Sequence, residues 1–151
     1  TIENTKEIFT ASGASIVNVK KEIDGFILNR LQGALLNEAM RLYSDGYASS
    51  DEIDATIRDG LGLRWAFMGP FETIDLNAPG GIKDYISRYG PMYIEMAKNQ
   101  TKIPDWSEEA GKKLEIERRK ILGHDELENR AKKRNQLLKS LRKVKIDNGE
   151  A

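Results

Sequence analysis

Residues 25–44 read GFILNRLQGALLNEAMRLYS, and this stretch decides the fold class. One side of the predicted helix carries apolar residues at spacings of three and four, namely Leu28, Leu31, Leu35, Ala39 and Leu42. A second side carries Phe26, Ile27, Leu36, Met40 and Tyr43. Because it is apolar on two sides, we expect this helix at the centre of a bundle, ending at Gly46.

Two polar side chains, Asn29 and Arg30, interrupt the apolar run of this helix. Asn is a poor helix former because its side chain competes for backbone hydrogen bonds, and burying its amide without a partner costs about 1–3 kcal/mol. Asn29 therefore serves either a bound molecule or a structural acceptor, and the residues alone leave both open. Arg30 points about 100° around the helix and is expected in a structural or interface ion pair.

The segment that follows predicts two short helices. Ser49-Ser50-Asp51-Glu52 forms a capping box that begins one of them, and Gly60 with Gly62 is expected to end it. Residues 63–68 are predicted to be an apolar connector. Gly69-Pro70 then begins the next helix, because proline suits the first helical position.

The remaining chain also has helical patterns. An apolar and aromatic stripe over residues 82–96 predicts a helix that is interrupted or kinked at Gly90-Pro91. Two charge-rich helices follow at about 107–122 and 125–145. The sequence therefore predicts an all-α bundle with short connections.

The first residues have a different pattern. Residues 3–12 predict a helix closed by Gly13, and the alternation over residues 14–20 predicts a strand. A helix followed by a strand looks like the last unit of an α/β domain. Because the chain opens with Thr1 rather than Met, we interpret it as processed or truncated.

The composition excludes several classes of function. Lysine and arginine total 24, aspartate and glutamate total 24, and there is no cysteine and one histidine. Disulfides, thiol catalysis and sites built from several imidazoles are therefore excluded, and the net charge gives no argument for nucleic acid. No apolar run approaches the roughly 20 residues that span a bilayer, and no signal peptide opens the chain. The expectation is a soluble, intracellular domain with neither a nucleic-acid nor a membrane partner.

Arg64 is the second candidate for chemistry. It lies between a glycine pair and a helix start, next to Trp65 and Phe67. In a partly dry setting its guanidinium could make a bidentate bond to a carboxylate. The alternative is a salt bridge to a nearby Asp or Glu, with both aromatic residues in the core.

Three other features have simpler structural explanations. His124 precedes a helix and is expected to be a solvated loop residue. Glu72 and Asp75 could bind a metal or share a proton, but their place near a helix start is explained by the helix dipole. The basic last helix has no interleaved aromatic residue for base stacking, so we expect it to pack on the body or on a second subunit.

Four motifs match those of a known family: Gly25 to Leu31, Glu38-Ala39 with Arg41-Leu42, Gly60 to Phe71, and Leu76-Asn77-Ala78. From Thr1 to Lys145 the sequence resembles the C-terminal part of the L-3-hydroxyacyl-CoA dehydrogenase family. Within that family it is most similar to the subgroup called lambda-crystallin or L-gulonate 3-dehydrogenase.

The resemblance implies an architecture. The helical domain, residues 24–122, would be a multi-helix bundle of the 6-phosphogluconate dehydrogenase C-terminal-like type. Residues 1–23 would be the remnant of an N-terminal Rossmann domain that binds NAD, and residues 123–151 a basic helix and tail. The family pattern further implies a cytoplasmic homodimer that contacts its own Rossmann domain.

The resemblance also assigns two residues. Asn29 would be the catalytic asparagine that orients the substrate, while the catalytic Ser, His and Glu would lie in the Rossmann domain, so that the isolated chain would be inactive. Arg64 would bind the carboxylate of a small hydroxy acid such as L-gulonate, although carnitine dehydrogenases share this segment. The alternatives are a 3-hydroxyacyl-CoA substrate, or a crystallin-like structural module without activity.

Overall fold

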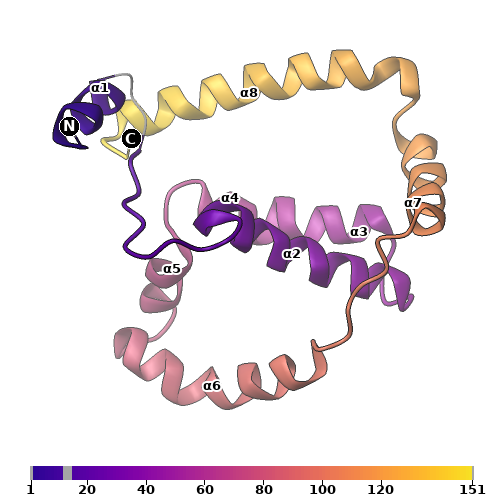
Figure 1. Ribbon diagram of the computed structural model, residues 1–151, viewed down its shortest axis with the longest axis horizontal. Coiled ribbons are helices and arrows are strands. Elements are labelled where there is room, and N and C mark those ends of the chain that lie inside the picture. Colours follow the sequence, from indigo (N-terminus) through magenta and orange to yellow (C-terminus); the bar gives the residue numbers. More distant parts are fainter. Residues whose placement is uncertain (1, 12–14, 151) are drawn as a thin grey trace. The chain divides into compact units, whose positions relative to one another are not determined.

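The computed structural model describes residues 2–11 and 15–150, and within them every regular element is helical (Figure 1). The all-α prediction is therefore confirmed. The α-helices are α1 (Ile2–Ala11), α2 (Phe26–Ser44), α3 (Ser50–Ala55), α4 (Gly62–Trp65), α5 (Pro70–Leu76), α6 (Gly81–Asn99), α7 (Glu108–Ile121) and α8 (Leu127–Asp147). A π-helix, η1 (Thr56–Leu61), joins α3 to α4, and a short 3-10 helix, η2 (His124–Glu126), precedes α8.

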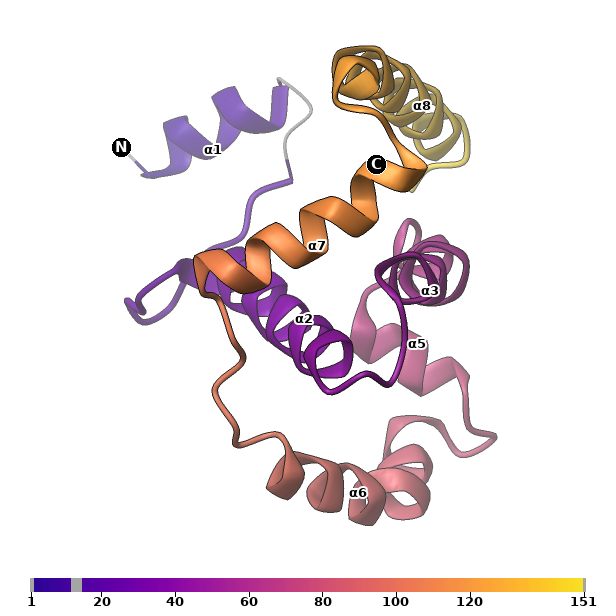
Figure 2. The same ribbon diagram turned by 90° about the vertical axis from the view of Figure 1, so that its right-hand side faces the viewer.

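The chain divides into two compact units. Unit 1 contains Thr1–Gly33 and Asp125–Ala151, and unit 2 contains Ala34–His124. Figure 2 gives a second view of the same helices. Each unit is described by itself below. The predicted division at residues 23 and 122 stays a prediction.

The predicted strand is not present. Residues 15–19 have no regular structure, and the described part of the chain contains no strand that could pair with them. An alternating sequence forms a strand only when a neighbouring strand takes its backbone hydrogen bonds. The expected helix closure at Gly13, and Ala14 at the start of the strand, lie outside the described residues.

Helix α2 begins at an unusual turn. Gly25 has φ of 79° and Phe26 has φ of 50°, and the Phe26 N–H donates to the Ile23 carbonyl oxygen at 3.1 Å. A left-handed backbone at a bulky residue costs about 1–2 kcal/mol. The first half of α2 is also exposed, with Leu28 at 75% and Leu31 at 60% of their full exposure. Within unit 1, no described element covers this half of α2, so the expectation that it lies at the centre of a bundle is not met there.

The connection from α2 to α3 follows the sequence pattern. Gly46 adopts φ of 76°, its N–H bonds the Tyr43 carbonyl at 3.1 Å, and α2 ends as predicted. At the start of α3, Glu52 accepts from the Ser49 N–H at 2.8 Å and from its hydroxyl at 2.6 Å. The Glu52 N–H approaches the Ser49 hydroxyl oxygen at 3.4 Å, which completes the predicted capping box. These hydrogen bonds hold the pKa of Glu52 below its ordinary value.

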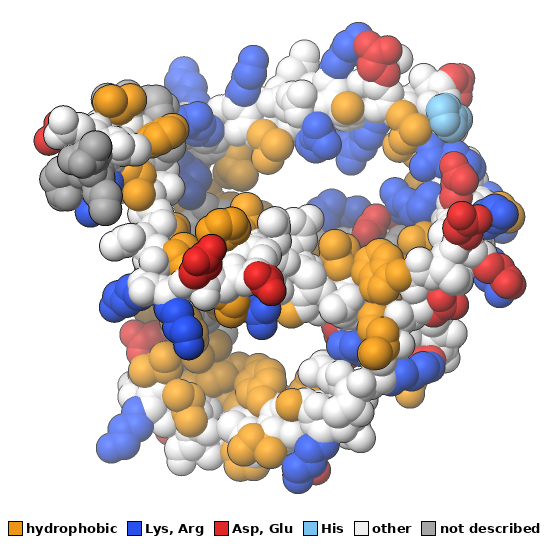
Figure 3. Space-filling view, viewed as in Figure 1, with side chains coloured by type: hydrophobic (Ala, Val, Ile, Leu, Met, Phe, Trp, Pro, Cys, Tyr) orange, Lys and Arg blue, Asp and Glu red, His pale blue; other side chains and the backbone are white. Residues whose placement is uncertain are grey.

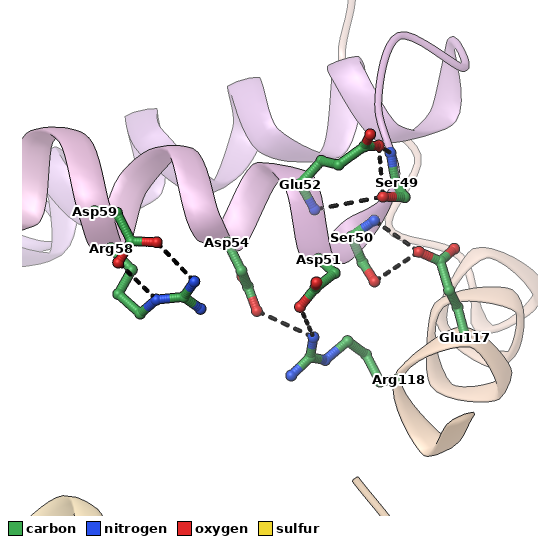
Figure 4. A network of polar contacts seen from close by, with 9 residues as sticks. All are labelled: Ser49, Ser50, Asp51, Glu52, Asp54, Arg58, Asp59, Glu117 and Arg118. Carbon is green, nitrogen blue, oxygen red and sulfur yellow. Dashed lines mark hydrogen bonds and ion pairs between the residues drawn. The ribbon is translucent and has the colours of Figure 1, made fainter. Parts of the chain in front are cut away.

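Helices α3 and α7 are joined by polar contacts (Figure 4). Both the N–H and the hydroxyl of buried Ser50 donate to the Glu117 carboxylate at 2.7 Å, and these bonds lower the pKa of Glu117. Arg118 pairs with Asp54 at 3.2 Å. A mainly apolar cavity of about 180 Å³ lies where α2, α3 and α7 meet, next to buried Met40. This junction is the core of unit 2.

The glycine pair does not end the helix, as the sequence had predicted, but lies within a continuous helical run from α3 through η1 to α4. The Gly62 N–H donates to the Ile57 carbonyl, five residues back, which defines a π turn. A Cβ at Gly62 would lie 2.9 Å from that carbonyl oxygen, so the turn leaves no room for a side chain there. Residues 62–65 are therefore helical rather than part of a connector.

Helices α5 and α6 pack against each other. Gly69 precedes α5 as predicted, and Pro70 is its first residue. The Asp75 carboxylate accepts from the Ile82 N–H at 2.6 Å and so satisfies a backbone donor in the first turn of α6. Helix α6 runs through Pro91 without interruption, so the predicted break at Gly90-Pro91 is absent. Figure 3 shows apolar side chains uncovered in this part of unit 2, which includes Phe71, Leu76, Tyr89, Met92, Tyr93 and Ile94.

Candidate substrate site

The π turn positions the first site residue. Arg64 lies in α4, two residues after Gly62, and its carbonyl accepts from the N–H groups of Phe67 and Met68, each at 3.1 Å. A π turn holds one residue more than an α-helical turn, so it shifts every later side chain by about 100° around the helix axis. The direction of Arg64 is therefore set by the wide turn that Gly62 permits.

The guanidinium of Arg64 is exposed and makes no hydrogen bond or ion pair with any residue in the described part of the chain. The salt bridge that was the alternative explanation for this residue is thus absent there. Trp65 and Phe67 are also partly exposed, at 40% and 39%, rather than enclosed in a core. All five N–H donors of Arg64 are available to a ligand.

Three tyrosines lie on one side of α6, at spacings of four. The hydroxyls of Tyr85 and Tyr93 are hydrogen-bonded at 2.8 Å, and their ring centroids are 6.4 Å apart. The Tyr89 ring lies 4.7 Å from that of Tyr85 at an interplanar angle of 49°. Aromatic rings at such separations attract each other, so the cluster holds the two bonded hydroxyls in place.

The tyrosine cluster lies within electrostatic reach of Arg64. The hydrogen bond to Tyr93 and burial raise the pKa of Tyr85, while the positive charge of Arg64 acts in the opposite direction. The net shift in the pKa of Tyr85 is upward. Helix α5 contacts both α4, which carries Arg64, and α6, which carries the tyrosines.

Asn29 lies on the first half of α2, in unit 1. Its side chain is exposed and makes no hydrogen bond to another described residue, so a buried structural amide is excluded for the chain by itself. Arg30 likewise has no ion pair within the described residues. The expected structural ion pair is therefore absent there, and the alternative of an interface ion pair stays a prediction. Asn29 and Arg64 belong to different units, and their roles stay predictions.

The remaining sequence candidates are structural or exposed. His124 is exposed in η2. Asp75 caps α6, as described above, and Glu72 lies in the first turn of α5. The described residues contain no group of three or more metal-ligating side chains placed to hold an ion.

A second cavity of about 470 Å³ lies between the end of α2 and α7. Its charged groups already have partners. Glu117 accepts from Ser50, Lys113 pairs with Glu109 at 3.0 Å, and Asp105 accepts from the Ser107 N–H at 2.9 Å. Charged groups that are already paired offer a ligand little, so we assign this cavity no site.

The described residues do not fit a dinucleotide. The Rossmann type of dinucleotide site consists of a strand, a glycine-rich turn and a helix N-terminus, and residues 2–11 and 15–150 contain no strand. The helices in these segments are also too short or too polar to cross a lipid bilayer.

The chain belongs to the family of the 3-hydroxyacyl-CoA dehydrogenase C-terminal domain, whose model matches residues 25–123. The resemblance stated from the sequence is therefore confirmed.

Several named proteins are similar to this chain in sequence. The chain is 44% identical to "Lambda-crystallin" from Oryctolagus cuniculus over 71% of its own length and 33% of that protein. It is 37% identical to "Lambda-crystallin homolog" from Homo sapiens over 76% of its length and 35% of that protein. It is 47% identical to "L-carnitine dehydrogenase" from Pseudomonas putida over 60% of its length and 28% of that protein. The chain thus matches about a third of the length of these relatives.

The tyrosine cluster was not identified from the sequence, which was interpreted there only as an apolar and aromatic stripe. Tyrosines at positions i, i+4 and i+8 bring three hydroxyls to one side of a helix, and that spacing was visible in residues 85–93. The hydrogen bond between the first and third of them needed the structure.

Proposed function

We propose that this chain is the substrate-binding C-terminal domain of an NAD-dependent dehydrogenase that oxidises a small, free 3-hydroxy acid such as L-gulonate. NAD and the catalytic base would be held by another domain of the whole protein, so residues 1–151 alone would be inactive. Asn29 would orient the substrate, and Arg64 would bind its carboxylate.

The observation that carries the proposal is the unpaired Arg64 guanidinium. A planar cation with five free donors matches the two oxygens of a carboxylate, whereas a thioester has no charge at that position. A relative named L-carnitine dehydrogenase supports the proposal, because L-carnitine is a free acid and not a CoA ester.

The test uses the full-length dehydrogenase and follows NADH formation at 340 nm. L-gulonate, L-carnitine and 3-hydroxybutyryl-CoA are offered side by side to the wild type and to Arg64→Ala. We expect turnover of one of the free acids, and a KM for it that rises at least about tenfold in the variant, as for loss of a charge-assisted hydrogen bond. Turnover of the CoA ester alone, unchanged in Arg64→Ala, would refute the proposal and favour fatty-acid chemistry.

A second candidate is a module whose role is assembly. It is favoured by the exposed apolar side chains of α2 and α6, because patches of this kind mark interfaces. We propose that these surfaces form a homodimer in either case. Sedimentation equilibrium is expected to give twice the chain mass of 17.0 kDa. A dimer with no dehydrogenase activity in the full-length protein would select the structural role.

A further inference from the structure

The mainly apolar cavity where α2, α3 and α7 meet lies within unit 2 and has a volume of about 180 Å³. Two of its lining residues, Met40 and Ser50, are only 7% and 6% exposed, whereas Leu36 and Trp106 are 43% and 58% exposed. The cavity therefore has a buried floor and a rim that solvent reaches. Its apolar lining also includes Ala39, Ile53 and Leu114.

The connector between α6 and α7 supplies Trp106, and three polar contacts fasten this connector to α2 and the turn after it. The Trp106 indole N–H donates to the side-chain oxygen of Asn37 at 3.0 Å. Earlier in the connector, the Arg41 guanidinium donates to the Lys102 carbonyl oxygen at 3.1 Å, and the Lys102 side chain pairs with Asp45 at 2.8 Å. The indole ring at the rim of the cavity is therefore held in position by the fold.

The polar groups that line the cavity already have partners. The Ser50 hydroxyl donates to Glu117 at 2.7 Å, and the Asp54 carboxylate pairs with Arg118 at 3.2 Å. Burial and a hydrogen bond with Glu117 raise the pKa of Tyr43. A charged molecule in the cavity would lose its hydration without gaining new hydrogen bonds, so the cavity favours an uncharged, apolar one.

The volume and the lining indicate the size and kind of molecule. An apolar cavity of about 150 Å³ is large enough to bind benzene, and this cavity is slightly larger. The rings of Tyr43 and Trp106 and the thioether of Met40 belong to its lining. Aromatic rings attract one another, and sulfur also attracts aromatic rings, so these three side chains favour an aromatic molecule over an aliphatic one of the same size.

We propose that this cavity is a binding site for a small, uncharged aromatic molecule of about the size of benzene, which contacts Trp106 at the rim and Met40 at the floor. A hydroxy acid such as L-gulonate would not fit this site, because its charge and its hydroxyls would find no free partner there. A bound ring would contact α2, α3 and α7 together, and so would stabilise the junction of these helices.

The experiment titrates the full-length protein into fluorobenzene and follows the ¹⁹F NMR signal of this probe, which is expected to shift in a saturable way. Ala39→Leu places a larger side chain in the cavity and should weaken binding at least about tenfold. Ala34→Leu is the matched control, because Ala34 is exposed on the same helix and lies outside the cavity lining, and its affinity should stay within about twofold of the wild type. In competition with the probe, benzoate should bind at least about tenfold more weakly than benzene, because its charge finds no free partner.

Should Ala39→Leu unfold, a measurement on the wild type decides. In protein labelled with ¹³C-methyl methionine, the ring current of bound benzene should move the signal of Met40, assigned with Met40→Leu. Met92 and Met96 lie exposed on α6 and should not move. Benzene that shifts all three methionines alike, benzene that shifts none of them, or equal affinity of the probe for the wild type and Ala39→Leu would each overturn the inference.

Discussion

The π turn at Gly62 offers a direct test of how Arg64 is positioned. In Gly62→Ala the new Cβ would meet the Ile57 carbonyl oxygen at 2.9 Å. That oxygen belongs to the backbone and accepts the Gly62 N–H, so it cannot move aside as a flexible side chain would. We expect the substitution to open the π turn or to strain it.

The size of the effect follows from two opposed contributions. Replacing glycine with alanine inside a helix stabilises by about 1 kcal/mol, while overpacking of this kind costs about 1–3 kcal/mol. Gly60 lies in the same π-helix and has nothing within 4 Å of its ideal Cβ. Gly60→Ala is therefore expected to show the helix stabilisation without the overpacking cost. The free energy of unfolding of Gly62→Ala should therefore be about 1–3 kcal/mol below that of Gly60→Ala.

Urea unfolding followed by circular dichroism at 222 nm measures this difference. With a slope of about 2 kcal/mol per molar urea, the midpoint of Gly62→Ala should lie about 0.5–1.5 M below that of Gly60→Ala. In the full-length enzyme the same variant should also raise the KM for the hydroxy acid, because Arg64 turns with the helix. Equal midpoints for the two variants would show that the turn accommodates a side chain, and would refute the reasoning.

Two further predictions concern hydrogen bonds that join helices. The folded pKa of Glu117 is lowered, first by the Ser50 hydroxyl, so its contribution to stability is present above the unfolded pKa and is lost as pH falls through the folded one. Ser50→Ala should therefore lose less stability than the wild type between pH 5 and pH 3; parallel urea midpoints across that range would contradict this. Asp75→Ala removes the acceptor for the Ile82 N–H and should destabilise by about 1 kcal/mol, against a few tenths for Glu72→Ala in thermal unfolding. Equal losses in both variants would argue against the capping role.

Features with a short-range cause were predictable from the sequence. The capping box at Ser49, the helix end at Gly46 and the proline start of α5 each depend on residues within one turn, and the structure confirms all three. Arg64 was singled out for its setting between glycines, but its lack of a salt bridge in the described residues depends on where distant carboxylates lie.

The errors come from patterns whose outcome depends on partners. Glycines at positions 60 and 62 usually end a helix, yet here they permit a π turn, which depends on a bond five residues back. The alternation over residues 15–19 favours a strand only where a sheet receives it. Two apolar sides on α2 indicate burial, and the described helices leave the first half uncovered.

Pro91 lies in α6 between the hydrogen-bonded tyrosines Tyr85 and Tyr93. Proline has no N–H to donate to the carbonyl of Ser87, so α6 is least supported in the turn between Tyr85 and Tyr93. The bond between the two hydroxyls spans that turn and braces the helix across it. The bond therefore stiffens α6 at its weakest point, and we expect amide exchange around residues 87–92 to be slower with the bond than without it.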